Sequence, residues 1–225
     1  MGGIFFIPVG IIISNILYFN KDNYDIILTL SFVIIFFMFV GFIDDFLSLK
    51  KRLNTGLSSN QKILLQLFIS LIFIIVCAAN NFIPQNILIA NKLVNIGNLI
   101  YPLGIFVLLA ESNSTNLTDG LDGLLSGCSV LIFTGLAITI LIDNPSNSFT
   151  LAPLCIAMAG ASMGFLFLNK YPAKLFMGDS GSLAIGASLG GIALISNQLW
   201  SLLIMGGILA AESISVIIQV SIFKI

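Results

Sequence analysis

Residues 26–43 read IILTLSFVIIFFMFVGFI, a run of eighteen positions without a charged side chain. A helix needs about 20 apolar residues to cross the hydrocarbon core of a bilayer, so this run predicts a membrane span. The run is unbroken rather than alternating, which favours a helix over a barrel strand. A helix also satisfies the backbone hydrogen bonds that lipid cannot supply.

The rest of the chain has the same character. Of its 225 residues, 58% are hydrophobic and 8% are charged, with a mean hydropathy of +1.10, whereas soluble domains carry about 25% charged residues. The first apolar run follows Met1 without a basic region, which indicates a span rather than a signal peptide. We expect eight apolar segments, at residues 4–19, 26–43, 62–79, 99–115, 122–142, 150–168, 182–196 and 199–220. The sequence therefore predicts an all-α polytopic transmembrane helical bundle, forming a single domain over residues 1–225.

Composition also excludes several kinds of site. The net charge of −1 gives no basic surface for nucleic acid. The chain has no histidine, which argues against a histidine-ligated zinc site and histidine acid–base chemistry. Cys77, Cys128 and Cys155 all fall within apolar runs, so they are interpreted as small core residues rather than a disulfide set.

The loops between the segments alternate in charge. One set of loops and loop ends carries seven basic residues, and the other set carries two, Lys21 and Lys92. The positive-inside rule places the richer set in the cytoplasm, together with both ends of the chain. The seven are Lys50, Lys51, Arg52, Lys62, Lys170, Lys174 and Lys224.

Two of the polar motifs on this face are rich in carboxylates. Asp44 and Asp45 end the second segment, where two adjacent carboxylates invite a divalent cation or raise the pKa of one partner, although an ordinary acidic helix end is the alternative. Asp119 and Asp122 follow Asn116 and would share a face if the helix has already begun. Asp119 could instead cap the fifth helix.

The third motif is NKYPAKLFMGDSGS at residues 169–182. Gly-Asp-Ser-Gly-Ser before an apolar helix predicts a donor-rich turn for phosphate, with Asp179 suited to a metal bound to that phosphate and Phe176 to stacking on a base. The alternative is a plain loop with a serine cap. Five carboxylates without histidine or paired cysteine favour Mg²⁺ as the cofactor, and nearby lysines favour phosphorylated substrates. The sequence therefore predicts phosphoryl chemistry at the cytoplasmic surface of the membrane.

These stretches resemble the phospho-N-acetylmuramoyl-pentapeptide transferases of the polyprenyl-phosphate N-acetylhexosamine-1-phosphate transferase superfamily. The resemblance runs along the whole chain, and DDFLSLKKR at 44–52 is similar to the cyanobacterial branch. The stretches that carry it are MGG at 1–3, GFIDD at 41–45, GLSSNQK at 56–62, NLTDGLDGL at 116–124, NKYPAKLFMGDSGSLAIG at 169–186 and AESISVIIQVSIFK at 211–224.

The resemblance implies an enzyme of peptidoglycan synthesis in the bacterial inner membrane, with its active face cytoplasmic. Undecaprenyl phosphate would attack UDP-MurNAc-pentapeptide, giving lipid I and UMP with Mg²⁺ as cofactor, and a homodimer would be possible. The resemblance further implies that Asp179 binds the metal. The implied catalytic residues are Asp44, Asp45, Asp122 and Asp179, and the implied substrate-binding residues are Lys62, Asn116, Asp119, Asn169, Phe176 and Gln219.

The chain also departs from the family pattern. Members of the family have ten spans, with one more helix before Met-Gly-Gly and a histidine-rich loop and a final helix after the last matching stretch, so we expect a fragment lacking both ends. Two other functions remain open. One is a sister enzyme that transfers N-acetylglucosamine-1-phosphate to a polyprenyl phosphate, and the other is a secondary transporter with buried carboxylates, whose ion site would lie near the bilayer midplane.

Overall fold

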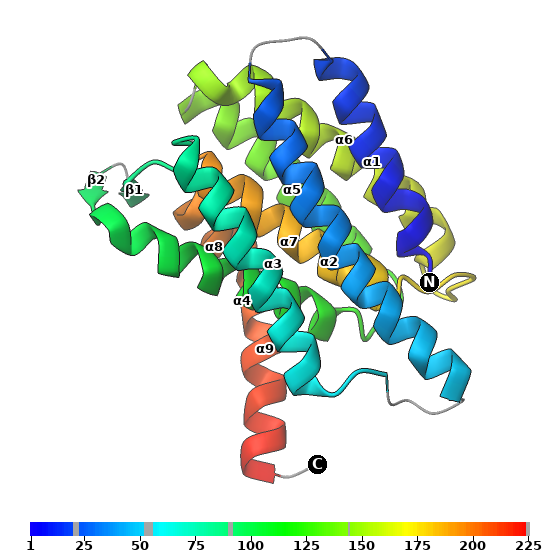
Figure 1. The fold of residues 1–225 in the computed structure, drawn as a ribbon. Coiled ribbons are helices and arrows are strands. Elements are labelled where there is room, and N and C mark those ends of the chain that lie inside the picture. The colour runs from blue at the N-terminus through cyan, green and yellow to red at the C-terminus, as the bar shows by residue number, and fades with distance from the viewer. Residues whose placement is uncertain (20–22, 52–55, 90–91, 144, 224–225) are drawn as a thin grey trace.

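A computed structural model describes residues 1–19, 23–51, 56–89, 92–143 and 145–223, with side chains described for residues 151–222 of the last range. The molecule is an all-α polytopic helical bundle with one short hairpin (Figure 1). The helices are α1 (Gly3–Tyr18), α2 (Tyr24–Lys51), α3 (Ser59–Ala79), α4 (Ile100–Thr118), α5 (Leu124–Asp143), α6 (Pro145–Asn169), α7 (Asp179–Ile195), α8 (Leu199–Met205) and α9 (Gly207–Ile218).

Seven of the predicted apolar segments each coincide with one helix, whereas the eighth, 199–220, covers both α8 and α9. A count of eight spans is not confirmed. Among the described residues, α2, α3, α5 and the Leu151–Asn169 part of α6 are long and apolar enough to cross a membrane. The pair α8 and α9 would add a fifth span, although it bends by 67°. Helices α1 and α7 are apolar but shorter. Helix α4 is long enough, but its hydropathy is too low for a candidate span because polar residues fill its second half.

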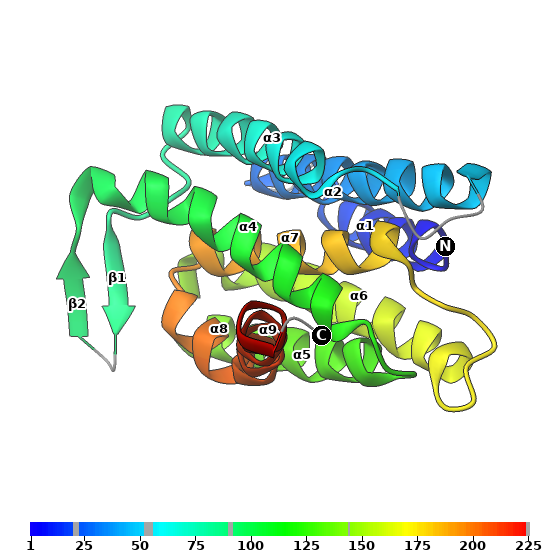
Figure 2. The ribbon, with the colours of Figure 1, turned by 90° about the horizontal axis from the view of Figure 1, so that it is seen from below.

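Helix α7 forms the centre of the bundle. Every residue from Ser180 to Ile195 is buried, as expected of a helix whose apolar surface extends all the way round. Helices α1, α2, α4, α5 and α8 pack against it, and Figure 2 shows α4 and α2 on different sides of it. Small residues such as Gly186 permit this crowding, since a Cβ there would overlap α4 atoms of Glu111 and Ser112.

The start of α7 is held at backbone-to-backbone distance by two other helices. A Cβ at Gly41 of α2 would overlap the backbone of Asp179 and Ser180, and a Cβ at Gly3 of α1 would overlap the backbone of Gly181. The Gly3 N–H also donates to the Met177 carbonyl at 3.0 Å. These contacts fix the position of Asp179, the first residue of α7.

A short hairpin lies between α3 and α4. Strands β1 (Asn86–Ile89) and β2 (Lys92–Asn95) pair antiparallel, and a 3₁₀ turn (η1, Gly97–Leu99) leads into α4. A π-helical turn (η2, Gln219–Phe223) follows α9. The hairpin joins the end of α3 to the start of α4, so it lies far from the opposite ends of these helices, where the polar motifs gather (Figure 1). Lys21, Arg52 and Lys224, used in the charge-bias prediction, lie outside the described residues.

Gly41→Ala should push α2 away from α7 and lower the free energy of unfolding by about 1–3 kcal/mol, because an overpacked helix contact must be relieved by backbone movement. The measurement is the thermal unfolding midpoint of the detergent-solubilised protein. Gly127→Ala on α5 is the matched control, since a Cβ at that position would have no neighbouring atom within 4 Å. Equal midpoints for the two variants would contradict the close contact.

Candidate active site

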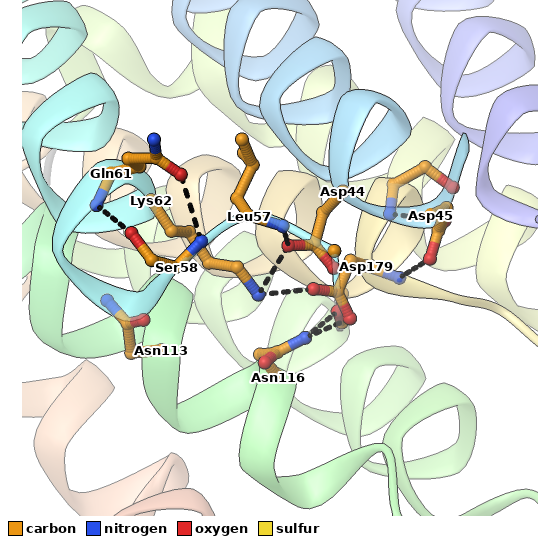
Figure 3. Close-up of polar contacts among 12 residues, drawn as sticks. Asp44, Asp45, Leu57, Ser58, Gln61, Lys62, Asn113, Asn116 and Asp179 are labelled. Carbon is orange, nitrogen blue, oxygen red and sulfur yellow. Dashed lines mark hydrogen bonds and ion pairs between the residues drawn. The ribbon is translucent and has the colours of Figure 1, made fainter. Parts of the chain in front are cut away.

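Polar side chains from four helix ends converge at one end of the bundle. Asp44 and Asp45 come from the last turns of α2, Lys62 from the first turn of α3, Asn116 from the end of α4, and Asp179 opens α7 (Figure 3). The three motifs that the sequence singled out are thus brought together in space. We refer to Asp44, Asp45, Lys62, Asn116, Asp119 and Asp179 as the carboxylate cluster.

Asp44 and Asp45 point in different directions, because neighbouring residues on a helix project about 100° apart. Asp44 turns toward α3, where its Oδ1 accepts a hydrogen bond from the Leu57 N–H at 2.9 Å and lies 3.6 Å from the Lys62 ammonium. Asp45 turns toward α7 (Figure 3). The pair therefore does not form one two-carboxylate metal site.

Asp45 caps the N-terminus of α7 from another helix. Its Oδ1 accepts from the Asp179 N–H at 3.1 Å and its Oδ2 from the Ser180 N–H at 3.2 Å. Gly178, at φ 75°, permits this approach, since a Cβ there would lie 2.6 Å from Asp45 Oδ2. These two amides are therefore not available to phosphate, contrary to the prediction from Gly-Asp-Ser-Gly-Ser. The alternative interpretation, a serine cap, is also wrong, because the cap of α7 is the Asp45 carboxylate.

Lys62 is the cation of the cluster. Its ammonium donates to Asp179 Oδ2 at 2.5 Å and faces Asp44 Oδ1. The start of α3 is set by a capping box, in which Ser58 Oγ accepts from the Gln61 N–H and Gln61 Oε1 accepts from the Ser58 N–H. This cap fixes the first turn, so Lys62 points into the cluster rather than toward lipid.

Asn116 holds the other oxygen of Asp179. Its Nδ2 donates to Asp179 Oδ1 at 2.8 Å and to Ser182 Oγ at 3.0 Å. Asp179 thus receives a hydrogen bond from α3 on one oxygen and from α4 on the other, and both of its oxygens face the interior of the cluster. Its carboxylate is the point that links α3, α4 and α7.

Asp119 lies in the turn after α4, where its backbone N–H donates to the Thr115 carbonyl. Burial, together with the charge of Asp179, raises the pKa of the Asp119 carboxyl to about 7. The next helix begins only at Leu124. The alternative in which Asp119 caps that helix is therefore wrong. The helix has not begun at Asp119 or Asp122, so the condition under which the two would share a helix face is not met.

Asp122 and Asn169 organise the loops beside the cluster. Asp122 Oδ2 accepts from the Ala173 N–H at 2.9 Å. Asn169 is 3% exposed, and its Oδ1 accepts from the Gly123 N–H and the Ser126 hydroxyl, while its Nδ2 donates to the Leu175 carbonyl. Both side chains are thus occupied in joining the turn before α5 to the loop before α7.

The two remaining predicted residues lie at the surface. Phe176 is 66% exposed on the loop before α7. Gln219 lies in η2, beyond α9, and forms no hydrogen bond to the carboxylate cluster in the part of the chain that the structure describes.

The donor set suits a hard cation, although no ligand shell is already assembled. The carboxylate cluster contains four carboxyl groups and one ammonium group, which faces Asp44 and Asp179. The available ligands are oxygens, which Mg²⁺ prefers. The described residues contain no group of three or more acidic or cysteine side chains placed to hold a metal. Asp179 Oδ2 accepts a hydrogen bond from Lys62, and Oδ1 accepts one from Asn116. A cation bound to Asp179 would therefore compete with those two contacts.

Several residues that shape the site were missed by the sequence analysis. The Ser58–Gln61 capping box has a readable signature, serine followed three residues later by glutamine. Gln66 and Asn113, which bond at 2.8 Å between α3 and α4, have no such signature. They lie on different helices, 47 residues apart in sequence, and only the packing of the two helices brings them together.

Comparison with known proteins places the chain among membrane glycosyltransferases. Residues 27–197 match the description "Glycosyl transferase family 4". The chain is 90% identical over its full length to a phospho-N-acetylmuramoyl-pentapeptide-transferase of Prochlorococcus marinus (strain NATL2A). It is 48% identical to the proteins of that name from Prochlorococcus marinus (strain MIT 9313) and Synechococcus sp. (strain CC9605). The chain spans 61%, 60% and 64% of the lengths of these relatives, respectively.

Asp45→Ala should lower the free energy of unfolding by about 1–3 kcal/mol, because two backbone amides at the start of α7 lose their acceptor. Asp45→Asn keeps one acceptor oxygen and should lose less. The measurement is the thermal unfolding midpoint of the purified protein in detergent, with the expected order wild type, Asp45→Asn, Asp45→Ala. An Asp45→Ala variant as stable as wild type would show that the carboxylate does not hold α7.

Proposed function

The chain belongs to glycosyl transferase family 4, and on that premise we propose that it transfers phospho-N-acetylmuramoyl-pentapeptide from UDP-MurNAc-pentapeptide to undecaprenyl phosphate. The products are lipid I and UMP. Support comes from the family match over residues 27–197 and from relatives whose names describe this transferase.

The observation that carries the proposal is the Lys62 ammonium between Asp44 and Asp179, at the end of an apolar helical bundle. A phosphoryl transfer between a nucleotide sugar and a lipid phosphate needs cationic groups at the level where water meets lipid. Lys62 provides a positive charge for the transferring phosphate, and the surrounding carboxylates keep it charged and oriented.

The proposed reaction is a direct displacement at phosphorus. An oxygen of the lipid phosphate forms a bond to the sugar-bearing phosphorus of the donor, and the bond from that phosphorus to the UMP oxygen breaks. Asp44 lies beside Lys62 and is proposed to orient the attacking phosphate or to accept its proton. Phe176 offers its exposed ring to uracil. Asn116, Asp119 and Asp122 are proposed to line the nucleotide region, Asn169 to support it through the loop, and Gln219 to reach it from beyond α9.

Mg²⁺ is the proposed cofactor, because an oxygen-only donor set with excess negative charge suits it. Asp179 is the proposed ligand, with Asp44 and Asp119 as its acidic neighbours. A bound Mg²⁺ would supply charge neutralisation for the phosphates. Lys62 and Asn116 would position the Asp179 carboxylate before the metal arrives, and Mg²⁺ would bind in competition with these two contacts.

The proposed location is the bacterial inner membrane, with the carboxylate cluster facing the cytoplasm, where the water-soluble nucleotide sugar is available. A homodimer is also proposed from the family resemblance alone. The transporter alternative is disfavoured because the cluster lies at helix ends rather than midway along broken helices.

The donor assay tests the proposal and separates it from the sister enzyme. Purified protein in lipid nanodiscs with undecaprenyl phosphate and Mg²⁺ should release UMP from UDP-MurNAc-pentapeptide. UDP-N-acetylglucosamine should release little. Preference for the second donor would reassign the chain to the sister activity, and release from neither would overturn the proposal.

Asp179→Asn should lower UMP release at least ~100-fold, about 3 kcal/mol of transition-state stabilisation, because an amide binds a hard cation weakly and accepts through one oxygen only. Folding should be retained, as judged by helical circular dichroism. The matched control is Asp143→Asn, since Asp143 contacts Gln198 at the far end of α5. Near-normal turnover by Asp179→Asn would refute the metal assignment.

Accessibility labelling tests the orientation. In a background with Cys77, Cys128 and Cys155 replaced, a cysteine at position 143 should react with an impermeant maleimide from outside the cell. A cysteine at position 174 should react only after the membrane is opened. The reverse pattern would place the carboxylate cluster on the side without nucleotide sugar.

A further inference from the structure

Helix α3 has little apolar surface inside the bundle, yet it carries the cation of the site. Most of its large side chains face outward, and its buried face is Gln66, Ile69, Ser70, Phe73, Ile74 and Cys77. Apolar contacts between helices are weakly specific in a bilayer, because lipid chains replace them at little cost. Hydrogen bonds between helices are therefore expected to determine the position of α3 along its neighbours.

Gln66 supplies such a bond. Its side chain is fully buried, and its Oε1 accepts from Asn113 Nδ2 of α4 at 2.8 Å. The Gln66 Nε2 atom has no partner among the described residues, so the amide is anchored through its oxygen. In the described chain, no other side-chain hydrogen bond joins α3 directly to α4.

The bond lies one helical turn from Lys62, on the same face of α3. The two helices run antiparallel with Gln66 opposite Asn113 and Ile74 opposite Gly104, where a Cβ would lie 2.7 Å from Ile74 Cδ1. Continuing this register by one turn toward the site brings Lys62 level with Asn116, and both of these side chains donate to Asp179. A slip of α3 along α4 would remove Lys62 from Asp179.

Helix α4 is itself fixed to α7. Thr115 Oγ1 donates to the Ser182 carbonyl at 2.8 Å, and Ser112 Oγ donates to the Leu183 carbonyl at 3.3 Å. Asn113 is oriented on its own helix by a second hydrogen bond, to the Leu109 carbonyl at 2.7 Å. The hydrogen bonds from α7 to α4, and from Asn113 of α4 to α3, therefore fix the position of α3 relative to α7.

We propose that Gln66 and Asn113 form a positioning pair that sets the register of α3, so that Lys62 reaches Asp179. Neither side chain contacts the reacting groups, so both act through Lys62. The importance of the pair for turnover rests on the proposed phosphoryl transfer, whereas its effect on Lys62 does not.

Amine labelling tests the structural part without substrate. Lys62, whose side chain is 17% exposed, should react slowly with an acetylating ester, because the reagent attacks only an uncharged amine that is free of carboxylate partners. Gln66→Met and Asn113→Leu should each raise the labelling rate of Lys62 at least ~3-fold by mass spectrometry. Ser70→Ala is the matched control, because Ser70 Oγ is buried on the same face of α3 without a partner among the described residues. It should leave the rate unchanged.

Turnover tests whether the pair acts through Lys62. Gln66→Met should lower kcat/KM for UMP release about 10-fold, and the reciprocal exchange Gln66→Asn with Asn113→Gln should recover most of it, because donor and acceptor are both restored. Thermal midpoints measured alongside separate this effect from loss of folded protein. Any fall that tracks the folded fraction, or an exchange that restores stability but not kcat/KM, counts against a positioning role.

The outcomes distinguish the two proposals. Faster Lys62 labelling in Gln66→Met with no UMP release even from wild type would sink the proposed reaction and leave the positioning pair standing. Unchanged Lys62 labelling in both single variants would overturn the positioning pair, whatever the enzyme does.

Discussion

Two hydrogen bonds from the first turn of α7 to the Asp45 carboxylate hold the centre of this protein. They bind the buried helix to α2 at the residue where Asp179 begins it, while Gly41 and Gly3 bring two backbones into contact with the same turn. Asp179 is thereby fixed in position, and its carboxylate accepts hydrogen bonds from Lys62 of α3 and Asn116 of α4. The other contacts of the cluster are arranged around a carboxylate that cannot move independently of the bundle.

The polar second half of α4 has a related role. Ser112, Asn113, Thr115 and Asn116 reduce the hydropathy of the helix, yet each makes a hydrogen bond to α3 or α7. In a bilayer such bonds compensate for the weak specificity of apolar contacts. The same residues that make α4 a poor candidate for a free-standing span make it the connector between the two helices that hold Lys62 and Asp179.

Much of this could be predicted from the sequence, since helix positions follow from apolar runs and the gathering of Asp44, Asn116 and Asp179 follows from their place at the ends of those runs. The number of spans could not, because α1 and α7 are short and α8 and α9 bend by 67°. Nor could the direction of each aspartate. Asp45 is bound by amides 134 and 135 residues away in sequence, and local patterns carry no information about such partners. The interpretation of Gly-Asp-Ser-Gly-Ser as a phosphate turn failed for this reason.

Gly178 is a position that tolerates substitution poorly. Its backbone lies at φ 75°, and the position of its missing Cβ is taken by Asp45. A replacement would have to adopt an unfavourable conformation and also displace the cap of α7. A compound seated against this glycine would therefore face a position where escape mutations damage the target itself, so resistance would have to arise elsewhere in the chain.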